Sequence, residues 1–126
     1  MMTNDRFKVT RVLKDLGIRG DLKGFYCLRD AICLAMEDFS IVHNITKQLY
    51  PKVAKMNDTT PTRVERAMRH AIETCWVNVN DELCGKMFGR YSKYVPTNGD
   101  FVATIADFLL MEKIAKELEE LCSERS

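Results

Sequence analysis

The stretch from residue 60 to residue 76, TPTRVERAMRHAIETCW, constrains the fold more than any other part of the chain. Thr60 is a residue type that caps helices, and Pro61 suits a first helical turn, where no intrahelical N–H bond is lost. Apolar residues then follow at steps of three and four, the spacing of one buried helix face: Val64, Ala67, Met68, Ala71, Ile72 and Cys75. At 3.6 residues per turn, Arg66 lies almost opposite this stripe, and Arg63 and Arg69 flank it. The stretch therefore predicts a helix that buries one face and exposes arginines on the other.

The residues before this helix complete a helix-turn-helix pattern. PKVAKM, residues 51–56, can form a short helix whose apolar positions are Val53, Ala54 and Met56, and NDTT supplies a turn of residues that bond their own backbone. A helix-turn-helix over about residues 51–76 would carry its second helix, 61–76, into the major groove of DNA. Arginine suits that place, because its planar fork can make two parallel hydrogen bonds to a phosphate or to the guanine edge. For the arginines alone, an ordinary solvated helix face is the alternative.

The other apolar patterns are also helical, and they predict an all-α fold. We expect α-helices at residues 5–16, 25–38, 41–50, 51–56, 61–76 and 82–88, with glycines and prolines between them. Ile45 and Leu49 should anchor the third of these helices, and Trp76, the only tryptophan, should plug the core. With 126 residues, the chain is long enough for a single domain, 1–126, of about six helices around one core.

A long C-terminal helix is expected from residue 101 to about residue 122, after a turn in which Thr97 and Asp100 can form a capping box. Its first half should pack on the domain through Ile105, Ala106, Leu109 and Leu110. Its second half carries an apolar seam at alternating steps of three and four: Met111, Ile114, Leu118 and Leu121. Two heptads fall short of the three or four that mark a coiled coil, so we expect this end to lie along its own domain. A dimer seam is the alternative.

Charge is distributed unevenly, although the formal net charge is only +1. Residues 52–71 contain five lysines and arginines against two acidic residues, whereas residues 107–126 contain six acidic residues against three basic ones. A basic middle and an acidic tail are consistent with a directed binding face. No apolar run reaches the ~20 residues that span a bilayer, and the N-terminus lacks the apolar core of a signal peptide. We therefore expect a cytoplasmic protein with no membrane partner.

Motifs of catalysis and of metal binding are missing from the sequence. The five cysteines include no C-x-x-C pair, and we interpret them as reduced thiols rather than as disulfides or zinc ligands. His43 and His70, the only histidines, lack metal-ligand spacing, and CGKMFG lacks the pattern of a phosphate-binding loop. We therefore expect no catalytic residue, no metal, no cofactor and no enzymatic activity.

Several stretches follow one another from about residue 16 to residue 110: IRGDLKGFYCLRDAI, NITKQLYPKVAK, TRVERAMRHAIE-x-x-W, the Phe88-Gly89 pair, and PTN followed by FVATIAD. In this order they resemble the C-terminal effector domain of the stage 0 sporulation response regulator, the master switch of endospore formation. The resemblance implies a six-helix, all-α fold that binds a short DNA box in promoters. Double-stranded DNA is thus the expected partner.

The resemblance also implies roles for individual residues. In the family, the arginines and the glutamate of the RVERA-x-RH segment read the bases, which here are Arg63, Glu65, Arg66 and Arg69. Contacts to the DNA backbone are expected from Lys52, Lys55, Thr60, Thr62 and His70. The family touches the sigma subunit of RNA polymerase through the segment after the recognition helix, where the candidates are Leu83, Lys86, Phe88 and Arg90. The apolar seam, and not the resemblance, supplies the candidates for a homodimer on tandem sites: Met111, Ile114, Leu118 and Leu121.

Three features depart from the family's pattern. The family domain follows a phosphorylated receiver domain, which this sequence does not contain, so we expect either an excised domain or a stand-alone regulator. Polar Asn57 follows Met56 where the family has an apolar residue before the turn, and we expect flexible Met56 to compensate. The loop before PTN is shorter, Val95 replaces the family's lysine, and the acidic tail extends past the family's usual end.

Two functions follow from these observations. The main prediction is a sequence-specific DNA-binding transcription regulator whose recognition helix, 61–76, reads a promoter box in the major groove. The alternative is a stand-alone protein-interaction module that pairs with a regulator or a sigma factor through the C-terminal helix.

Overall fold

The computed structural model describes residues 3–78, 81–89 and 94–125, and within them it contains helices and no strand. The α-helices are α1 (Thr3–Leu16), α2 (Lys23–Glu37), α3 (Tyr50–Met56), α4 (Pro61–Trp76), α5 (Asp81–Phe88) and α6 (Asn98–Arg125). A 3-10 turn, η1 (Phe39–His43), and a π turn, η2 (Ile45–Leu49), connect α2 to α3. The predicted all-α fold of about six helices is confirmed.

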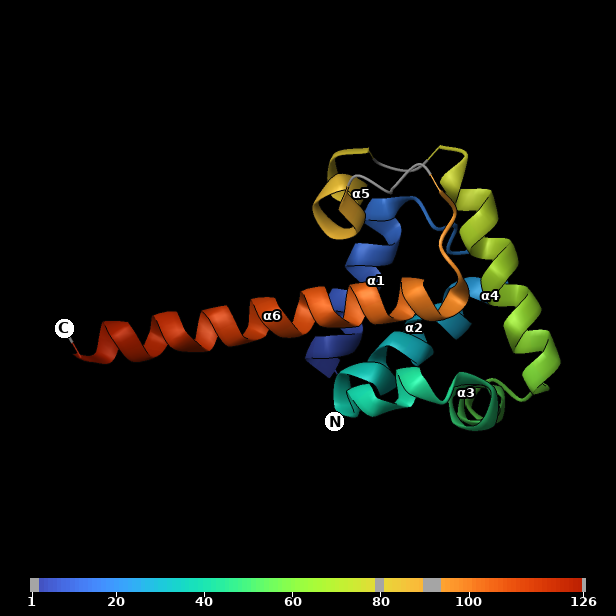
Figure 1. The fold of residues 1–126 in the computed structure, drawn as a ribbon, viewed down its shortest axis with the longest axis horizontal. Coiled ribbons are helices and arrows are strands. Elements are labelled where there is room, and N and C mark those ends of the chain that lie inside the picture. The colour runs from blue at the N-terminus through green and yellow to red at the C-terminus, as the bar shows by residue number, and fades with distance from the viewer. Residues whose placement is uncertain (1–2, 79–80, 90–93, 126) are drawn as a thin grey trace.

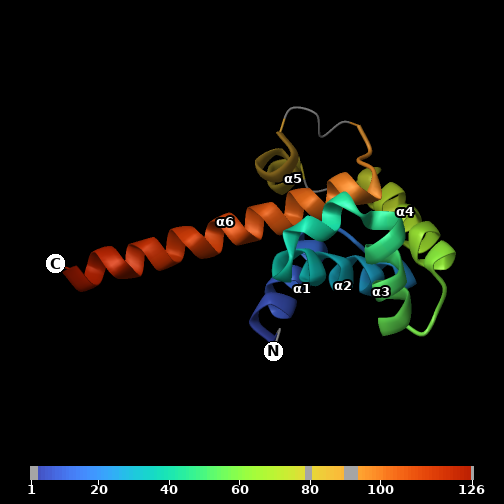
Figure 2. The ribbon, with the colours of Figure 1, turned by 60° about the horizontal axis from the view of Figure 1, so that its bottom comes forward.

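Helix α2 lies at the centre of the fold, and α1, α4 and the first half of α6 pack around it (Figures 1 and 2). Its buried side chains come from all sides of the helix, and they include Phe25, Leu28, Ile32 and Ala35. Because a helix that is apolar nearly all round must be covered on every side, α2 is the central helix on which the other helices pack.

The segment before Pro51 differs from the prediction, because it is not one α-helix over residues 41–50. The side chain of Asp38 caps η1 by accepting from the N–H of Ser40, and Asn44 then breaks the helical path with a φ of −143°. The chain resumes as a π turn and continues directly into α3. Pro51 has no N–H to donate back into this turn, so regular α-helical bonding cannot run through it. Leu49 is nevertheless fully buried, as expected, whereas Ile45 is only half-buried.

Aromatic side chains join the end of α4 to α5 and α6. Trp76 is 8% exposed, and its ring lies edge-on to Phe88 at 5.1 Å and to Phe101 at 6.2 Å between centroids. Phe88 in turn stacks on Phe101 at 5.7 Å. Trp76 therefore plugs the core as predicted. Helix α5 ends at Gly89, whose φ of +69° is easily adopted only by glycine.

Helix α6 is longer than expected and leaves the domain halfway along its length. Thr97 caps it by accepting from the N–H of Asp100 at 3.1 Å. Leu109 is its last buried residue, and every residue from 111 to 124 is exposed. Figures 1 and 2 show this half projecting into solvent. The expectation that it lies along its own domain was wrong, because the elements that contact α6 cover only its first half.

Candidate nucleic-acid interface

Helices α3 and α4, joined by a turn at residues 57–60, form the predicted helix-turn-helix. The hydroxyl of Thr60 accepts from the N–H of Arg63 at 3.3 Å, and Pro61 occupies the first turn of α4. One face of α4 is buried through Val64, Met68, Ala71, Ile72, Cys75 and Trp76. This face fixes the rotation of α4 about its own axis, and therefore decides which side chains the helix presents to solvent.

The turn is held by polar contacts and not by an apolar plug. The amide of Asn57 donates to Asp30 Oδ2 and to the carbonyl of Val53, both at 2.9 Å. Asp30 is 7% exposed and also accepts from Arg29 Nε at 3.2 Å. Met56 is 46% exposed, so the expectation that its side chain compensates for Asn57 was wrong. Asn57 instead ties the turn to α2, and Asp58 follows it with a φ of +51°.

Glycine allows α2 and α4 to approach closely at one point. A Cβ on Gly24 would lie 2.2 Å from the carbonyl oxygen of Ala67 and 2.6 Å from Ala71 Cβ. The helix expected from the sequence begins at residue 25 and leaves Gly24 outside it, but Gly24 lies in the first turn of α2. Only glycine fits here without moving the recognition helix away from its support.

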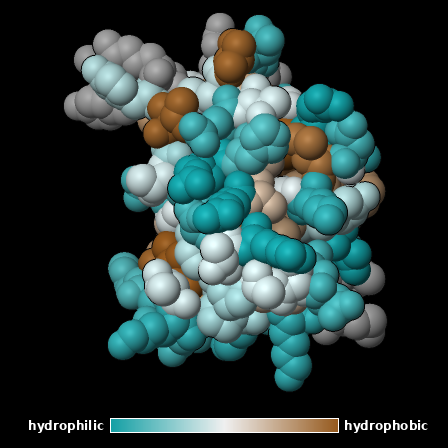
Figure 3. All heavy atoms as spheres, turned by 90° about the vertical axis from the view of Figure 1, so that its right-hand side faces the viewer, coloured by the Kyte–Doolittle hydropathy of each residue, from teal (hydrophilic) through white to brown (hydrophobic). Residues whose placement is uncertain are grey.

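The exposed face of α4 carries the three arginines expected from the pattern, and we name Arg63, Arg66 and Arg69 the reading face. Figure 3 looks onto the side of the molecule where α4 lies, and hydrophilic side chains cover most of that side. Within the described part of the chain, Arg63 and Arg66 form no ion pair. Arg69, by contrast, pairs with Glu65 at 2.9 Å and with Glu73 at 3.8 Å. Two of the three guanidinium groups are thus free to meet a ligand.

Glu65 lies on the flank of α4, next to the start of α6. Its side chain is about one-third exposed, and its backbone carbonyl accepts from Asn98 Nδ2 at 3.0 Å. Asn98 Nδ2 also donates to the hydroxyl of Tyr50 at 3.1 Å, and burial raises the pKa of that hydroxyl. Asn98 itself is 8% exposed. One buried amide therefore joins α6, α4 and the start of α3.

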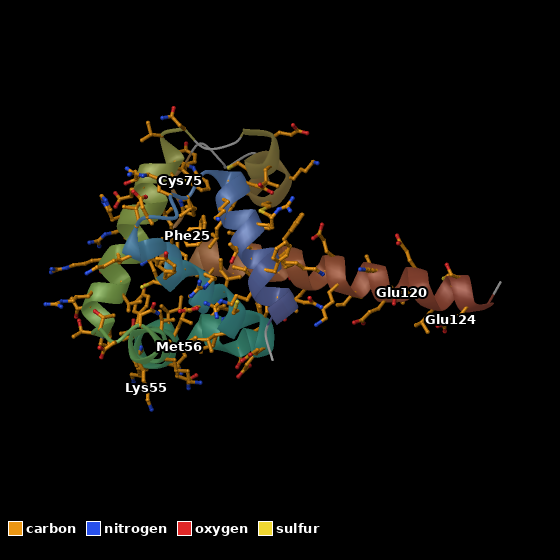
Figure 4. The ribbon with its side chains drawn as sticks, turned by 180° about the vertical axis from the view of Figure 1, so that it is seen from behind. Phe25, Lys55, Met56, Cys75, Glu120 and Glu124 are labelled. Atoms are coloured by element: carbon orange, nitrogen blue, oxygen red, sulfur yellow. The ribbon has the colours of Figure 1, made fainter. Side chains whose placement is uncertain are left out.

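The residues expected at the DNA backbone surround the reading face. Lys52 and Lys55 are exposed on α3, Thr60 and Thr62 are exposed at the start of α4, and His70 is exposed farther along it. Figure 4 shows Lys55 pointing outward at the end of the molecule where α3 lies. If α4 lay in the groove of a duplex, these side chains would lie close to the DNA backbone on either side of it.

Sequence reasoning missed two residues beside the reading face. Lys23 and Tyr26, from the first turns of α2, line a groove of about 490 Å³ together with Arg63 and Arg66. Tyr26 is 44% exposed, and the guanidinium of Arg29 lies 5.2 Å from the centre of its ring. Lys23 stands directly before Gly24 in the sequence, but the helix predicted there begins at residue 25. Lys23 was therefore not recognised as part of the first turn of a helix.

The candidates for a sigma contact are only partly exposed. Lys86 is exposed on α5, whereas Leu83 is half-buried and Phe88 is engaged by Trp76 and Phe101. Arg90 lies outside the described residues. Lys86 also borders a groove of about 550 Å³ that continues to Met111 on α6.

The cysteines behave as buried apolar residues with one exception. Cys27, Cys33, Cys75 and Cys84 are buried, and Cys122 is exposed on α6. Burial raises the pKa of the thiols of Cys27, Cys33 and Cys75 to about 11. Among the described residues, no three His, Cys, Asp or Glu side chains are grouped as metal ligands, and no helix has the length and apolarity to cross a membrane.

A comparison with protein families matches residues 9–109 of the chain to the C-terminal domain of sporulation initiation factor Spo0A. The match includes the helix-turn-helix, begins at Val9 within α1, and ends at Leu109, where α6 leaves the core. This family is a DNA-binding regulatory domain and not an enzyme family. The chain belongs to the family of Spo0A C-terminal domains, the DNA-binding effector domains of a sporulation regulator.

Proposed function

We propose that this protein reads a specific promoter sequence by inserting α4 into the major groove of DNA. The observation that carries the proposal is the pair of exposed, unpaired arginines, Arg63 and Arg66, on the second helix of a helix-turn-helix. A guanidinium that already holds a carboxylate must release it before it can bind a base. Arg63 and Arg66 have no such partner to release among the described residues, so they are the stronger base readers.

Glu65 and Arg69 act in this proposal as a coupled pair. Because their side chains form an ion pair at 2.9 Å, each restrains the rotamers of the other before DNA arrives. A glutamate can accept from the cytosine amino group, and an arginine can bind guanine. On DNA the ion pair would open, and the two side chains would then read neighbouring bases. Their position on the flank of α4 makes their reach to the bases depend on the tilt of the helix in the groove.

The surrounding side chains supply affinity that does not depend on sequence. Lys52, Lys55 and His70, with the hydroxyls of Thr60 and Thr62, are placed to contact phosphates on either side of the groove. We add Lys23, because it shares a groove with Arg63 and Arg66. Each phosphate contact from a lysine or arginine releases counterions, so affinity should fall as the salt concentration rises.

Fluorescence anisotropy with two duplexes tests the proposal, one with the family's promoter box and one scrambled, each at two salt concentrations. The wild-type chain should bind the box about 10³-fold more tightly or better. Arg66→Ala should lose about 1–3 kcal/mol on the box, which is roughly 5- to 150-fold, and should change scrambled binding much less. Lys55→Ala should weaken both duplexes alike and reduce the salt dependence.

Arg11→Ala is the matched control, because it removes the same charge from an exposed position on α1. Its affinity for the box should equal that of the wild type. The base-reading role of Arg66 would be refuted if Arg66→Ala weakened box and scrambled duplexes by the same factor. Equal affinity of the wild-type chain for both duplexes would refute sequence-specific reading altogether.

A further inference from the structure

The projecting half of α6 exposes an apolar seam that the fold leaves uncovered. Met111, Ile114, Leu118 and Leu121 are 59%, 50%, 57% and 55% exposed, and we name them the tail seam. Their spacing of three, four and three residues places Met111 and Leu118 at a positions and Ile114 and Leu121 at d positions of a heptad. A row of large apolar side chains on one side of a charged, solvated helix marks an interaction surface.

In a pair formed by two copies of this chain, charge favours the parallel orientation. In this heptad Glu117 and Glu124 occupy g positions, whereas Ala115 and Cys122 occupy e positions. An antiparallel pair would bring the glutamates of the two g rows side by side, and like charges that close repel. A parallel pair sets each g position against an e position of its partner. Each glutamate would then face an uncharged residue.

The direction of α6 relative to α4 favours the same orientation. Helix α6 begins against α4, where Asn98 binds the carbonyl of Glu65, and runs away from it. Figures 1, 2 and 4 all place the projecting end, with Glu120 and Glu124, on the side opposite α4. Two chains joined by parallel tails would turn both reading faces in one direction, whereas antiparallel tails would turn them in opposite directions.

We propose that the tail seam forms a short parallel coiled coil between two copies of this chain when both stand on one DNA duplex. A parallel coiled coil has its two-fold axis along the helices, so the two reading faces would meet inverted copies of the promoter box. The proposal rests on the proposed function, because DNA supplies the surface that brings the two chains together.

The length of the tail seam explains why the pairing depends on DNA. Two heptads are fewer than the three or four of a self-sufficient coiled coil, so free chains at low micromolar concentration should remain monomers. Two chains bound side by side on DNA experience an effective concentration on the order of millimolar, which can sustain such a weak contact. The tail seam would thereby convert two independent binding events into one cooperative event.

Anisotropy titrations with three duplexes test this: one box, two inverted boxes, and two boxes in direct repeat, with spacings varied by whole turns. The seam variant is Ile114→Ser/Leu118→Ser. The matched control, Lys116→Ser/Glu120→Ser, changes the same helix at c and f positions and preserves net charge. All four residues are exposed, so neither variant disturbs the core.

The wild type and the control should bind the inverted boxes, at the spacing that gives the highest affinity, at least ~10-fold more tightly per box than the single box. The seam variant should lose this gain in affinity and should bind the single box as tightly as the wild type does. A seam variant that keeps the full gain, or a wild-type gain confined to direct repeats, would overturn the proposal. Failure of every chain to bind the single box would refute the proposed function instead.

Disulfide trapping on the duplex with two inverted boxes tests the pairing directly. The chain with Leu121→Cys and Cys122→Ser should form a disulfide-linked dimer in oxidised glutathione, because identical d positions face each other in a parallel pair. The chain with Glu120→Cys and Cys122→Ser has its thiol on the outer side and should stay monomeric. Equal trapping of the two chains, or none in either, would overturn the parallel coiled coil and leave a helix of another protein as the occupant of the tail seam.

Discussion

Gly24 is the position where one added methyl group should do the most damage. A Cβ added at residue 24 would lie 2.2 Å from the carbonyl oxygen of Ala67, which belongs to the backbone of α4. Ordinary contacts of this kind exceed ~3 Å, so Gly24→Ala requires α2 and α4 to separate by about 1 Å. Overpacking of this size costs about 1–3 kcal/mol, which exceeds the up to ~1 kcal/mol that alanine gains over glycine in a helix.

Urea unfolding followed by circular dichroism measures this cost. Gly24→Ala should lower the free energy of unfolding by about 1–3 kcal/mol. Because Ala67 lies on the recognition helix, the variant should also bind the promoter box more weakly at temperatures where it is fully folded. Gly85→Ala is the matched control, since a Cβ at Gly85 on α5 meets no atom within 4 Å. That control should gain about 0.4–1 kcal/mol.

The reasoning would be refuted by a Gly24→Ala variant that is as stable as the wild type and binds the box equally well. Such a result would mean that α2 and α4 can part without loss, and that their close approach does not position the reading face.

Four further predictions follow from contacts described above. Asn98→Leu should cost about 1–3 kcal/mol in urea unfolding, because it removes the donor to the Glu65 carbonyl and the Tyr50 hydroxyl; Asn78→Leu, at an exposed site, should cost far less. Asn57→Ala and Asp30→Ala should be coupled by roughly 1 kcal/mol or more in a double-mutant cycle, and additive losses would show that the 2.9 Å bond does not hold the turn. Only Cys122 should react quickly with a thiol reagent in the folded chain. Burial raises the pKa of Cys27, Cys33 and Cys75 from 9 to about 11, so these thiols lose their protons at lower pH in the unfolded state than in the folded state, and the free energy of unfolding should fall between pH 9 and pH 11. An unfolding free energy that stays constant over this range would contradict the burial of these thiols. Lys86→Ala should leave DNA affinity unchanged and lower transcription from a promoter with the box in a purified polymerase assay, whereas undiminished transcription would remove Lys86 from the sigma contact.

Periodicity alone predicted much of the fold, because most helices bury one apolar stripe. The pattern around Val64 and Met68 gave both the extent of α4 and its exposed arginines, and the Thr60 cap formed as expected. The segment 41–50 was wrong, because its apolar residues fit a helix while Asn44 and Pro51 prevent regular α-helical bonding. Glycines were ambiguous for a related reason. A glycine that permits a turn and one that permits two helices to touch look alike in sequence, as Gly24 demonstrates.

The candidate site was predictable in its residue types but not in their pairing. Sequence spacing placed Arg63, Arg66 and Arg69 on one side of α4, yet it could not separate the two free guanidinium groups from the one that Glu65 and Glu73 hold. Lys23 and Tyr26 reach the site only through the packing of α2 against α4. The bond from Asn57 to Asp30 spans 27 residues, and no local pattern contains it.

The buried amide of Asn98 gives α6 a mechanical role. This helix runs for 28 residues without interruption, a rigid rod of about 42 Å at 1.5 Å per residue. One end of the rod is fastened to the backbone of α4 at Glu65, and the other end stands free in solvent. A partner bound to the free end of α6 would therefore set the angle at which α4 meets its target, because α6 has no break between its two ends that could absorb a rotation.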